Sequence, residues 1–379
     1  MYNTGGNLRI LHWAFPFTLS KGGQSVFIER IALEFSKLGH TTGIITAQTL
    51  PDEVTALETH FKNLVSLFQL PSDHVAPGVH SRTYGELKHS IENFAPDIIH
   101  IHNLESSMLV YLRSYLNMST KKPLVIITVH DLSTIMKLKH LEKISHLNRF
   151  FDAVIFPSKY MQETFAAYEG GKKPIFKTIY NGVPLKPEVE VRDRNHLQLL
   201  FAADLQEHKG GVLLLSAWKK LFHEFPDVKL KIAGDGPTRS FLETYAKSMQ
   251  FEEQVEFCGW LSQDQLNQEF SRDCVLGIPS LVGEAFGQIG AEGSMSGVPI
   301  IANRIGALTE IVEDGLSGFT VTTGDTQELA TRIRDLLTNG NLRRSMGDAG
   351  RIRAISNFEL LTSVKSYEDL CTFIMDSIS

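Results

Sequence analysis

Short apolar runs alternate with helix-type patterns along most of the 379-residue chain. Residues 8–12, 42–46 and 98–102 are apolar runs of strand length, and a helical pattern over 24–38 separates the first two. Parallel strands need a crossover connection long enough to hold a helix, so this alternation is typical of parallel sheets. The sequence therefore predicts an α/β fold.

The predicted strands form two sets, because a turn signal at Asn181-Gly182 and a charged stretch at 186–196 interrupt the series. The length exceeds one typical domain and fits two. We place the boundary near 181–196 and predict an exposed connector there and a last helix over 360–375. The other predicted strands are 125–128, 153–156 and 177–180 in the first set, and 197–203, 230–233, 255–258, 275–279 and 299–302 in the second.

Composition excludes several classes of protein. The net charge of −6 gives no electrostatic argument for nucleic acid as a partner. No apolar run approaches the roughly 18 residues of a membrane span, and the N-terminus lacks a signal-peptide pattern. The cysteines Cys258, Cys274 and Cys371 are odd in number and far apart, which indicates reduced thiols in a cytoplasmic protein, two of them on core faces.

Two glutamates, Glu284 and Glu292, follow the predicted strand 275–279. A helix predicted over 287–296 places Glu284 in the loop and Glu292 about one turn inside the helix. The N–H groups of a helix N-terminus attract anions, and carboxylates bind hydroxyl groups. This arrangement suits a sugar joined to a nucleotide diphosphate, although two glutamates at this spacing also fit an ordinary solvated surface.

Glycines crowd the same short helix. Each glycine in a helix costs about 1 kcal/mol relative to alanine, so their number indicates that something approaches the backbone closely. They are Gly287, Gly290, Gly293 and Gly297.

This stretch resembles the signature of the family 4 retaining glycosyltransferases. The resemblance implies the GT-B fold, with two Rossmann-like domains facing across a cleft: an acceptor-side domain at 1–182 and a nucleotide-sugar domain at 183–360. It also implies that a helix at 361–379 crosses back to the first domain. The matching residues are Ser280, Glu284, Phe286, Gly287, Glu292, Gly297, Pro299, Ile301 and Ala302, continued by 306–315 and Gly318-Phe319.

The resemblance also implies an activity: retaining transfer of a sugar from a UDP- or GDP-linked donor to a glycan, lipid-linked or small-molecule acceptor, as in polysaccharide biosynthesis. Glu284 would hold sugar hydroxyls, Glu292 the ribose, and Phe286, Gly287 and Gln288 would line the donor site. No cofactor and no metal are implied.

Lys209 follows the predicted strand 197–203, and its ammonium group suits the developing charge of a diphosphate. By resemblance, Lys209 holds the donor phosphates. The family has arginine where Asp204 stands and glycine where Ala203 stands. The expected set of cations around the donor diphosphate therefore lacks one, unless another cation such as Arg304 contacts the diphosphate.

Three glycine loops follow predicted strands. Gly22-Gly23 is not a dinucleotide fingerprint, but by resemblance it faces the donor diphosphate. Gly234, Gly236 and Gly259 would wall the nucleobase pocket. Ordinary tight turns are the alternative explanation of these glycines, although the context favours the nucleobase site for Gly234, Gly236 and Gly259.

Histidines also stand at strand ends. His100 and His102 share one face, but two ligands are too few for a metal site, so we expect cleft-wall or core groups. His130-Asp131 follows strand 125–128, at the strand end where α/β sheets bind ligands. By resemblance, His130 contacts the donor sugar or leaving group, and Asp131 orients the histidine or meets the acceptor.

Other interpretations stay open. Residues 135–149 carry Lys137, Lys139, Lys143 and Arg149 beside apolar residues, which fits either peripheral contact with an anionic membrane or an exposed helix packed by its apolar stripe. The same fold also serves nucleotide-sugar epimerases and non-catalytic binding proteins, and the Asp204 departure favours the latter.

Overall fold

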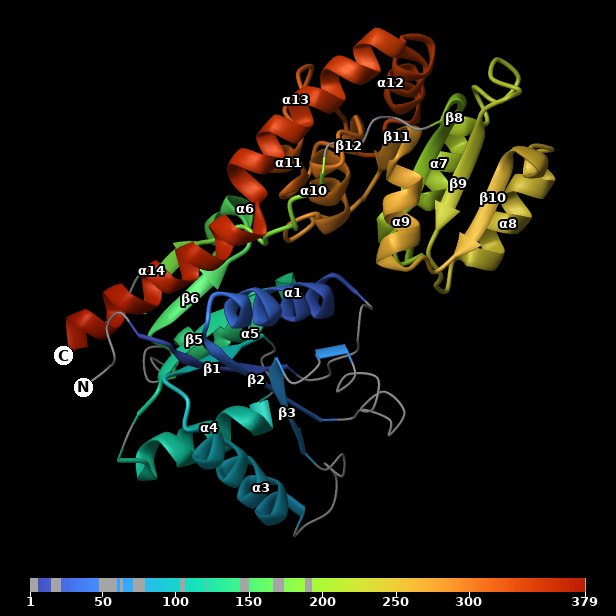
Figure 1. Cartoon of the computed structure of the whole chain (residues 1–379). Coiled ribbons are helices and arrows are strands. Elements are labelled where there is room, and N and C mark those ends of the chain that lie inside the picture. Colours follow the sequence, from blue (N-terminus) through green and yellow to red (C-terminus); the bar gives the residue numbers. More distant parts are fainter. Residues whose placement is uncertain are drawn as a thin grey trace. The chain divides into compact units, whose positions relative to one another are not determined.

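The computed structural model describes residues 6–14, 22–47, 60–61, 64–70, 79–102, 106–120, 122–143, 150–165, 174–187 and 193–378. The chain divides into two compact units. The first unit comprises Met1–Gly182 with Leu360–Ser379, and the second comprises Val183–Glu359. Each unit has its own sheet with helices packed against it (Figure 1).

The first unit contains a seven-stranded parallel sheet in the order β3-β2-β1-β4-β5-β6-β7. The chain builds outward from β1 in one direction and from β4 in the other, so the β1–β4 boundary is the topological switch point of this sheet. The strands are β1 (Arg9–Trp13), β2 (Thr41–Ala47), β3 (Val65–Leu70), β4 (Ile98–Ile101), β5 (Leu124–Thr128), β6 (Ala153–Phe156) and β7 (Ile175–Thr178). Its helices include α1 (Gly23–Lys37), α3 (Val79–Phe94), α4 (Ser106–Met118), α5 (Leu132–Lys143), α6 (Lys159–Phe165) and α14 (Leu360–Ile378).

Helix α14 belongs to the first unit although it is the last element of the chain (Figure 1). Val364, Tyr367 and Cys371 on α14 are buried in the same core as Phe27 and Ile28 of α1. Burying this apolar face stabilises the attachment of the C-terminal segment to a sheet formed by the start of the chain.

The second unit contains a six-stranded parallel sheet in the order β10-β9-β8-β11-β12-β13, with its switch point between β8 and β11. The strands are β8 (Asp193–Ala202), β9 (Lys229–Ala233), β10 (Val255–Gly259), β11 (Arg272–Ile278), β12 (Ile300–Asn303) and β13 (Gly318–Val321). Its helices include α7 (Gly211–Trp218), α8 (Arg239–Ser248), α9 (Gln263–Phe270), α10 (Gln288–Met295), α11 (Leu308–Ile311), α12 (Thr326–Thr338) and α13 (Gly340–Phe358).

The parallel α/β architecture confirms the predicted fold class, with two differences in detail. Strand β8 begins at Asp193, inside the expected connector, because Asp193 pairs with Arg272 and extends the ladder into a polar segment. Strands β3 and β13 were not predicted. Strand β13 is only four residues long and begins at Gly318, whose glycine is required because a Cβ there would lie 2.2 Å from the carbonyl oxygen of Ile300.

Several smaller expectations can be compared with the structure. Cys274 and Cys371 are buried free thiols, as predicted. On α5, Ile135 and Leu138 are buried while Met136 is 67% exposed, which fits a helix packed by its apolar stripe. Residues 144–149 lie outside the described part, so membrane contact stays a prediction. Among the described helices, none combines the length and the apolarity needed to cross a bilayer.

Candidate functional site

The loops that follow β8 and β11 meet at the switch point of the second sheet. Their strands are neighbours, with Cys274 opposite Gln198 and Leu276 opposite Leu200. Ligands of open parallel sheets bind at the carboxyl ends of the strands, at such a point. The β8 loop carries Lys209 and the β11 loop carries Glu284, so the sheet brings together two residues predicted from sequence.

Lys209 and Glu284 form an ion pair. Lys209 Nζ donates to Glu284 Oε1 at 2.6 Å, and the hydroxyl of Ser280 donates to the same oxygen at 2.7 Å. The two charged side chains are 23% and 19% exposed, so a ligand can reach them. Glu284 Oε2 accepts no hydrogen bond from the described residues, which leaves an acceptor oxygen for a hydroxyl-bearing ligand.

Close backbone contact explains why the two loops meet. Gly210 has φ 77°, and a Cβ at this position would lie 1.9 Å from the carbonyl oxygen of Pro279. The N–H of Leu281 donates to the carbonyl of His208 at 2.7 Å. Only glycine fits such a left-handed contact, so Gly210 allows the Lys209 loop to lie against the Glu284 loop.

The β12 loop supports Glu284 from another direction. The N–H of Ala307 donates to the carbonyl of Glu284 at 3.1 Å. The buried Asn303 amide donates to the carbonyls of Pro279 and Ser280, both at 3.0 Å. These bonds hold the loop in one conformation before any ligand arrives. Sequence reasoning missed Asn303, whose only signal was an amide residue at the end of a predicted strand.

Glu292 lies in α10 and is only 3% exposed. Gln288 Nε2 donates to its Oε1 at 3.2 Å, and Gln263 Nε2 donates to its Oε2 at 3.1 Å. Helix α10 starts after Gly287, which has φ 91° and ψ 52°. A carboxylate at such depth forms stronger hydrogen bonds than one in water, including bonds from a ligand hydroxyl. Gln263 carried no motif and was not predicted.

The side chain of Phe286 is buried in the core of the second unit. It is 4% exposed, and its ring centroid lies 5.7 Å from that of Phe358 in a T-shaped contact. Hydrophobic packing turns this ring into the core below the loop, and the predicted contact of Phe286 with the donor stays a prediction.

Gly234 and Gly236 follow strand β9, and Gly259 is the last residue of the neighbouring strand β10. A Cβ on Gly234, with φ 125°, would lie 1.8 Å from the carbonyl oxygen of Ala203, and one on Gly236 would lie 2.7 Å from that of Leu205. The N–H of Gly234 donates to the carbonyl of Gly259 at 2.7 Å. Loop packing alone explains these glycines, so their role in a nucleobase pocket stays a prediction.

Asp204 stands where the family has a cationic arginine, and Arg304 is a cation that could take its place. Asp204 is exposed, and its carboxylate accepts from Gln206 at 3.2 Å. Arg304 donates to the carbonyl of Thr320 at 3.0 Å and lies 3.7 Å from Asp314. In this structure the guanidinium group of Arg304 is engaged by strand β13 and Asp314, and whether it contacts the donor stays a prediction.

In the first unit, Gly22-Gly23 opens helix α1, with Gly22 at φ 78°. A Cβ on Gly22 would meet nothing within 4 Å, so backbone conformation rather than crowding favours glycine there. Their contact with a diphosphate stays a prediction.

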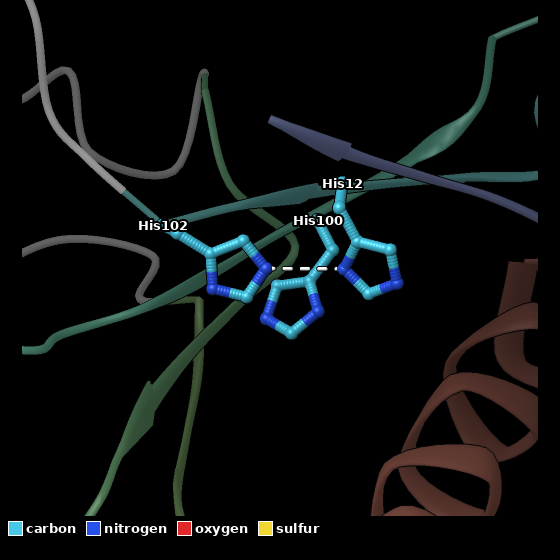
Figure 2. A group of neighbouring side chains, drawn as sticks. All are labelled: His12, His100 and His102. Atoms are coloured by element: carbon cyan, nitrogen blue, oxygen red, sulfur yellow. Dashed lines mark hydrogen bonds between the residues drawn. The ribbon is translucent and has the colours of Figure 1, made fainter. Parts of the chain in front are cut away.

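Histidines gather at the switch point of the first sheet (Figure 2). His12 of β1 lies opposite His100 of β4 in the sheet. His12 Nδ1 lies 3.1 Å from His102 Nε2, and His102 Nδ1 lies 3.0 Å from His130 Nε2. His100 Nε2 instead bonds to the hydroxyl of Thr128 at 2.8 Å.

Burial keeps these rings neutral. It lowers the pKa of His12 to about 3 and that of His130 to about 4, the latter opposed by the nearby charge of Asp131. Burial also holds the pKa values of His100 and His102 well below the usual range. The sequence pattern indicated two histidines here, and the pairing of β1 with β4 adds His12. Nitrogen atoms of His12, His100 and His102 lie within 4.8 Å of one another, a spacing that suits a metal ion.

Asp131 caps helix α5 instead of orienting His130. Its Oδ1 accepts from the N–H of Thr134 at 2.7 Å and from the hydroxyl of Ser133 at 2.6 Å. Burial raises the pKa of Asp131, but these hydrogen bonds outweigh burial and hold the pKa below its usual value. The orienting role expected for Asp131 is therefore replaced by a capping role.

Two family models match the sequence: Glycosyl transferases group 1 over residues 184–353 and Glycosyltransferase Family 4 over residues 21–186. The N-acetyl-alpha-D-glucosaminyl L-malate synthase of Bacillus anthracis is 25% identical over 93% of this chain and 94% of its own length. A GDP-mannose-dependent phosphatidylinositol monomannoside mannosyltransferase of Mycolicibacterium smegmatis is 28% identical over 56% of this chain. The chain spans little more than half of the first curated relatives it matches, 54% and 59%.

A solved structure gives the same fold. The Anabaena protein HepE in complex with UDP-glucose superposes with a TM-score of 0.75 at 20% identity, covering 96% of this chain and 99% of that one. At this identity the likeness concerns the fold alone, and it confirms the GT-B class predicted from the sequence.

Proposed function

The chain belongs to the group 1 glycosyltransferases of family 4, and we propose that it is a retaining enzyme that transfers a sugar from a nucleoside-diphosphate donor to an acceptor. The observation that supports this most is the Lys209–Glu284 pair at the switch point of the second sheet. One loop offers a cation for phosphate, and the adjoining loop offers a carboxylate for hydroxyls.

The proposed donor site divides the sugar and phosphate between these loops. Glu284 Oε2 accepts a hydrogen bond from a sugar hydroxyl near the reacting carbon, since Oε1 already accepts from Lys209 and Ser280. Lys209 and the N–H groups that begin α10 stabilise the diphosphate. Lys209 contacts both the ligand phosphate and Glu284 in this proposal. Binding of the diphosphate therefore affects the carboxylate that positions the sugar.

Glu292 binds the ribose hydroxyls in this proposal. Its carboxylate is held by Gln288 and Gln263, so its orientation is fixed before the ligand arrives. The base lies against the loops of Gly234 and Gly259. Because HepE is described with UDP-glucose and the mycobacterial relative as GDP-mannose-dependent, uridine and guanosine donors are the first to test.

The proposed reaction needs no enzymic nucleophile and no metal. The acceptor oxygen forms a bond to the anomeric carbon on the face from which the diphosphate leaves. The bond between that carbon and the phosphate oxygen breaks, and the acceptor proton passes to the leaving oxygen. Lys209 and the α10 N-terminus offset the charge that develops on the diphosphate. The acceptor is a glycan, a lipid-linked molecule or a small molecule, used in the cytoplasm or at the membrane surface.

One observation favours a second candidate, a non-catalytic nucleotide-binding protein. Asp204 stands where the family has arginine, and it is exposed with only Gln206 as its side-chain partner among the described residues. Turnover separates the two candidates, because both bind nucleotide but only the enzyme consumes donor.

Incubation with a panel of UDP- and GDP-sugars, followed by proton NMR, tests the proposal. We expect slow release of nucleoside diphosphate from one donor even without acceptor, and a product with the donor's anomeric configuration when acceptor is present. Inversion would contradict the retaining mechanism. Binding of nucleotide without any turnover, with a broad acceptor mixture present, would favour the non-catalytic candidate.

A further inference from the structure

The three rings of His12, His102 and His130 form a continuous hydrogen-bonded chain. It begins at the buried His12 in β1, passes through the buried His102 after β4, and ends at the partly exposed His130 after β5. The two N···N distances are 3.1 and 3.0 Å, so each link requires one shared proton.

Counting protons shows that the two hydrogen bonds of this chain must point in the same direction. A neutral imidazole has one N–H donor and one lone-pair acceptor. His102 uses both nitrogens, so it must donate through one and accept through the other. Both links therefore point the same way, either outward from His12 to His130 or inward from His130 to His12.

One observation favours the outward direction. His12 Nε2 is buried and has no partner among the described residues, and buried orphan N–H groups are rarer in proteins than under-satisfied acceptors. An outward chain leaves a lone pair there rather than an N–H.

We propose that His12 and His102 fix His130 as the tautomer protonated at Nδ1, so that His102 is a positioning residue for His130. His102 Nδ1–H donates to His130 Nε2, and His130 presents a neutral N–H at its other nitrogen. This step rests on the proposed function: the N–H is a hydrogen-bond donor for an oxygen of a bound substrate. It performs the orienting task that Asp131, occupied at the cap of α5, does not.

His100 stands beside this chain but outside it. Its Nε2 bonds to the hydroxyl of Thr128, which in turn bonds to the hydroxyl of Tyr367 at 2.9 Å. His100 is fully buried like His12, so it serves as a control for the general cost of altering a buried histidine.

A metal ion is the rival occupant of this cluster. The nitrogens of His12, His100 and His102 lie close enough to bind one, but the group contains no carboxylate to offset the charge of a buried divalent ion. A metal would also have to replace the His12–His102 hydrogen bond. Hydrogen bonding accounts for the observed contacts without added charge.

Nitrogen-15 NMR of histidine-labelled full-length protein near pH 7 tests the tautomer without using activity. His130→Gln assigns the His130 signals. We expect the proton of His130 to be on Nδ1. The Nε2 signal should be that of an unprotonated nitrogen that accepts a hydrogen bond. A proton on Nε2 of His130 would overturn the proposal. So would stoichiometric zinc in metal analysis, with His102 signals that change on chelation.

A matched pair of variants tests His102 as the positioning residue. Asparagine can place an amide N–H near the Nδ1 position and keep the bond to His130, whereas glutamine can reach only toward Nε2 and His12. We expect His102→Gln to lose the fixed tautomer and at least about tenfold in kcat, while His102→Asn keeps the tautomer and loses less. His100→Gln should leave the tautomer unchanged. If both His102 variants lost the Nδ1-protonated tautomer of His130 to the same extent, the proposal would be overturned. If the wild-type protein had this tautomer but turned over none of the nucleotide-sugar donors, that result would count against the proposed function alone.

Discussion

Lys209 Nζ lies 2.6 Å from Glu284 Oε1, although 75 positions separate the two residues in the chain. The pair forms because β8 and β11 are neighbours in the second sheet and Gly210 lies against Pro279. A diphosphate near Lys209 would meet a cation already aligned with a hydroxyl-binding carboxylate. The central claim is that this pair, beside the start of α10, holds a nucleotide sugar.

Glu284→Gln should lower transfer by at least about a hundredfold while the protein stays folded. The charged carboxylate forms hydrogen bonds roughly twice as strong as a neutral amide does, and the variant also removes the anionic partner of Lys209. Turnover with the preferred donor and circular dichroism measure the two effects. Glu224→Gln is a matched control, because Glu224 pairs with Arg334 in an exposed ion pair of the same unit. Wild-type turnover in Glu284→Gln would remove Glu284 from the site.

Gly210→Ala should damage the site more than Gly315→Ala. The two glycines have nearly the same φ, 77° and 76°, but an added Cβ would lie 1.9 Å from Pro279 O at position 210 and meet nothing within 4 Å at position 315. Left-handed strain alone costs about 1 kcal/mol, whereas the contact at 210 also forces the loops apart. We expect a loss of about 3 kcal/mol or more, or loss of donor binding in a folded variant. Similar effects of both changes in chemical denaturation and donor titration would mean that loop contact is unimportant.

Asp204→Arg should tighten binding of the donor diphosphate, because it replaces an exposed anion by the cation that the family has at this place. Arg304→Ala should leave that binding unchanged, because Thr320 and Asp314 already engage Arg304. Titrations at low and high salt measure both variants, since an added phosphate contact should be screened by salt. If Arg304→Ala weakened diphosphate binding and Asp204→Arg had no effect, position 304 rather than position 204 would be the one that contacts the diphosphate.

The first unit should lose stability as the pH falls below about 6.5. Above this pH, His12 and His130 are neutral in both states; below it, the unfolded chain binds protons that these two rings do not accept in the folded protein until about pH 3 and about pH 4. The free energy of unfolding should therefore fall by about 1.4 kcal/mol per pH unit for each such histidine. Urea unfolding between pH 7 and 5 checks this slope.

His12→Gln should reduce that pH slope, and exposed His89→Gln should leave it unchanged. A slope that is the same in wild type and His12→Gln would show that His12 does not enter the native state as a buried neutral ring.

The sequence predicted the parts of the site that depend on local pattern. Glycines and a strand end place Glu284 in a loop and Glu292 in a helix, because these features depend on neighbouring residues. It could not predict that His12 joins His100, since this follows from β1 and β4 being adjacent in the sheet. Nor could it find Gln263, because an amide that holds a buried carboxylate needs no fixed spacing.

The sequence and the resemblance also identified residues near the site without predicting which contacts their side chains form. Phe286 follows the signature, but packing against Phe358 turns its ring into the core. Arg304 was named as one cation that could reach the diphosphate, and in the structure it lies 3.7 Å from Asp314. Asp131 was expected to orient a histidine, but it caps α5. In each case, a tertiary contact decided between several directions that the sequence allows.

Calorimetric titration of wild type and Lys209→Ala with the preferred nucleoside, its diphosphate and the nucleotide sugar tests the central claim most directly. We predict that Lys209→Ala weakens the diphosphate and the nucleotide sugar by about 10- to 100-fold, as expected for a charge-assisted hydrogen bond, and leaves the nucleoside nearly unchanged. Equal weakening of all three ligands, or no nucleotide binding by the wild-type protein, would contradict the account.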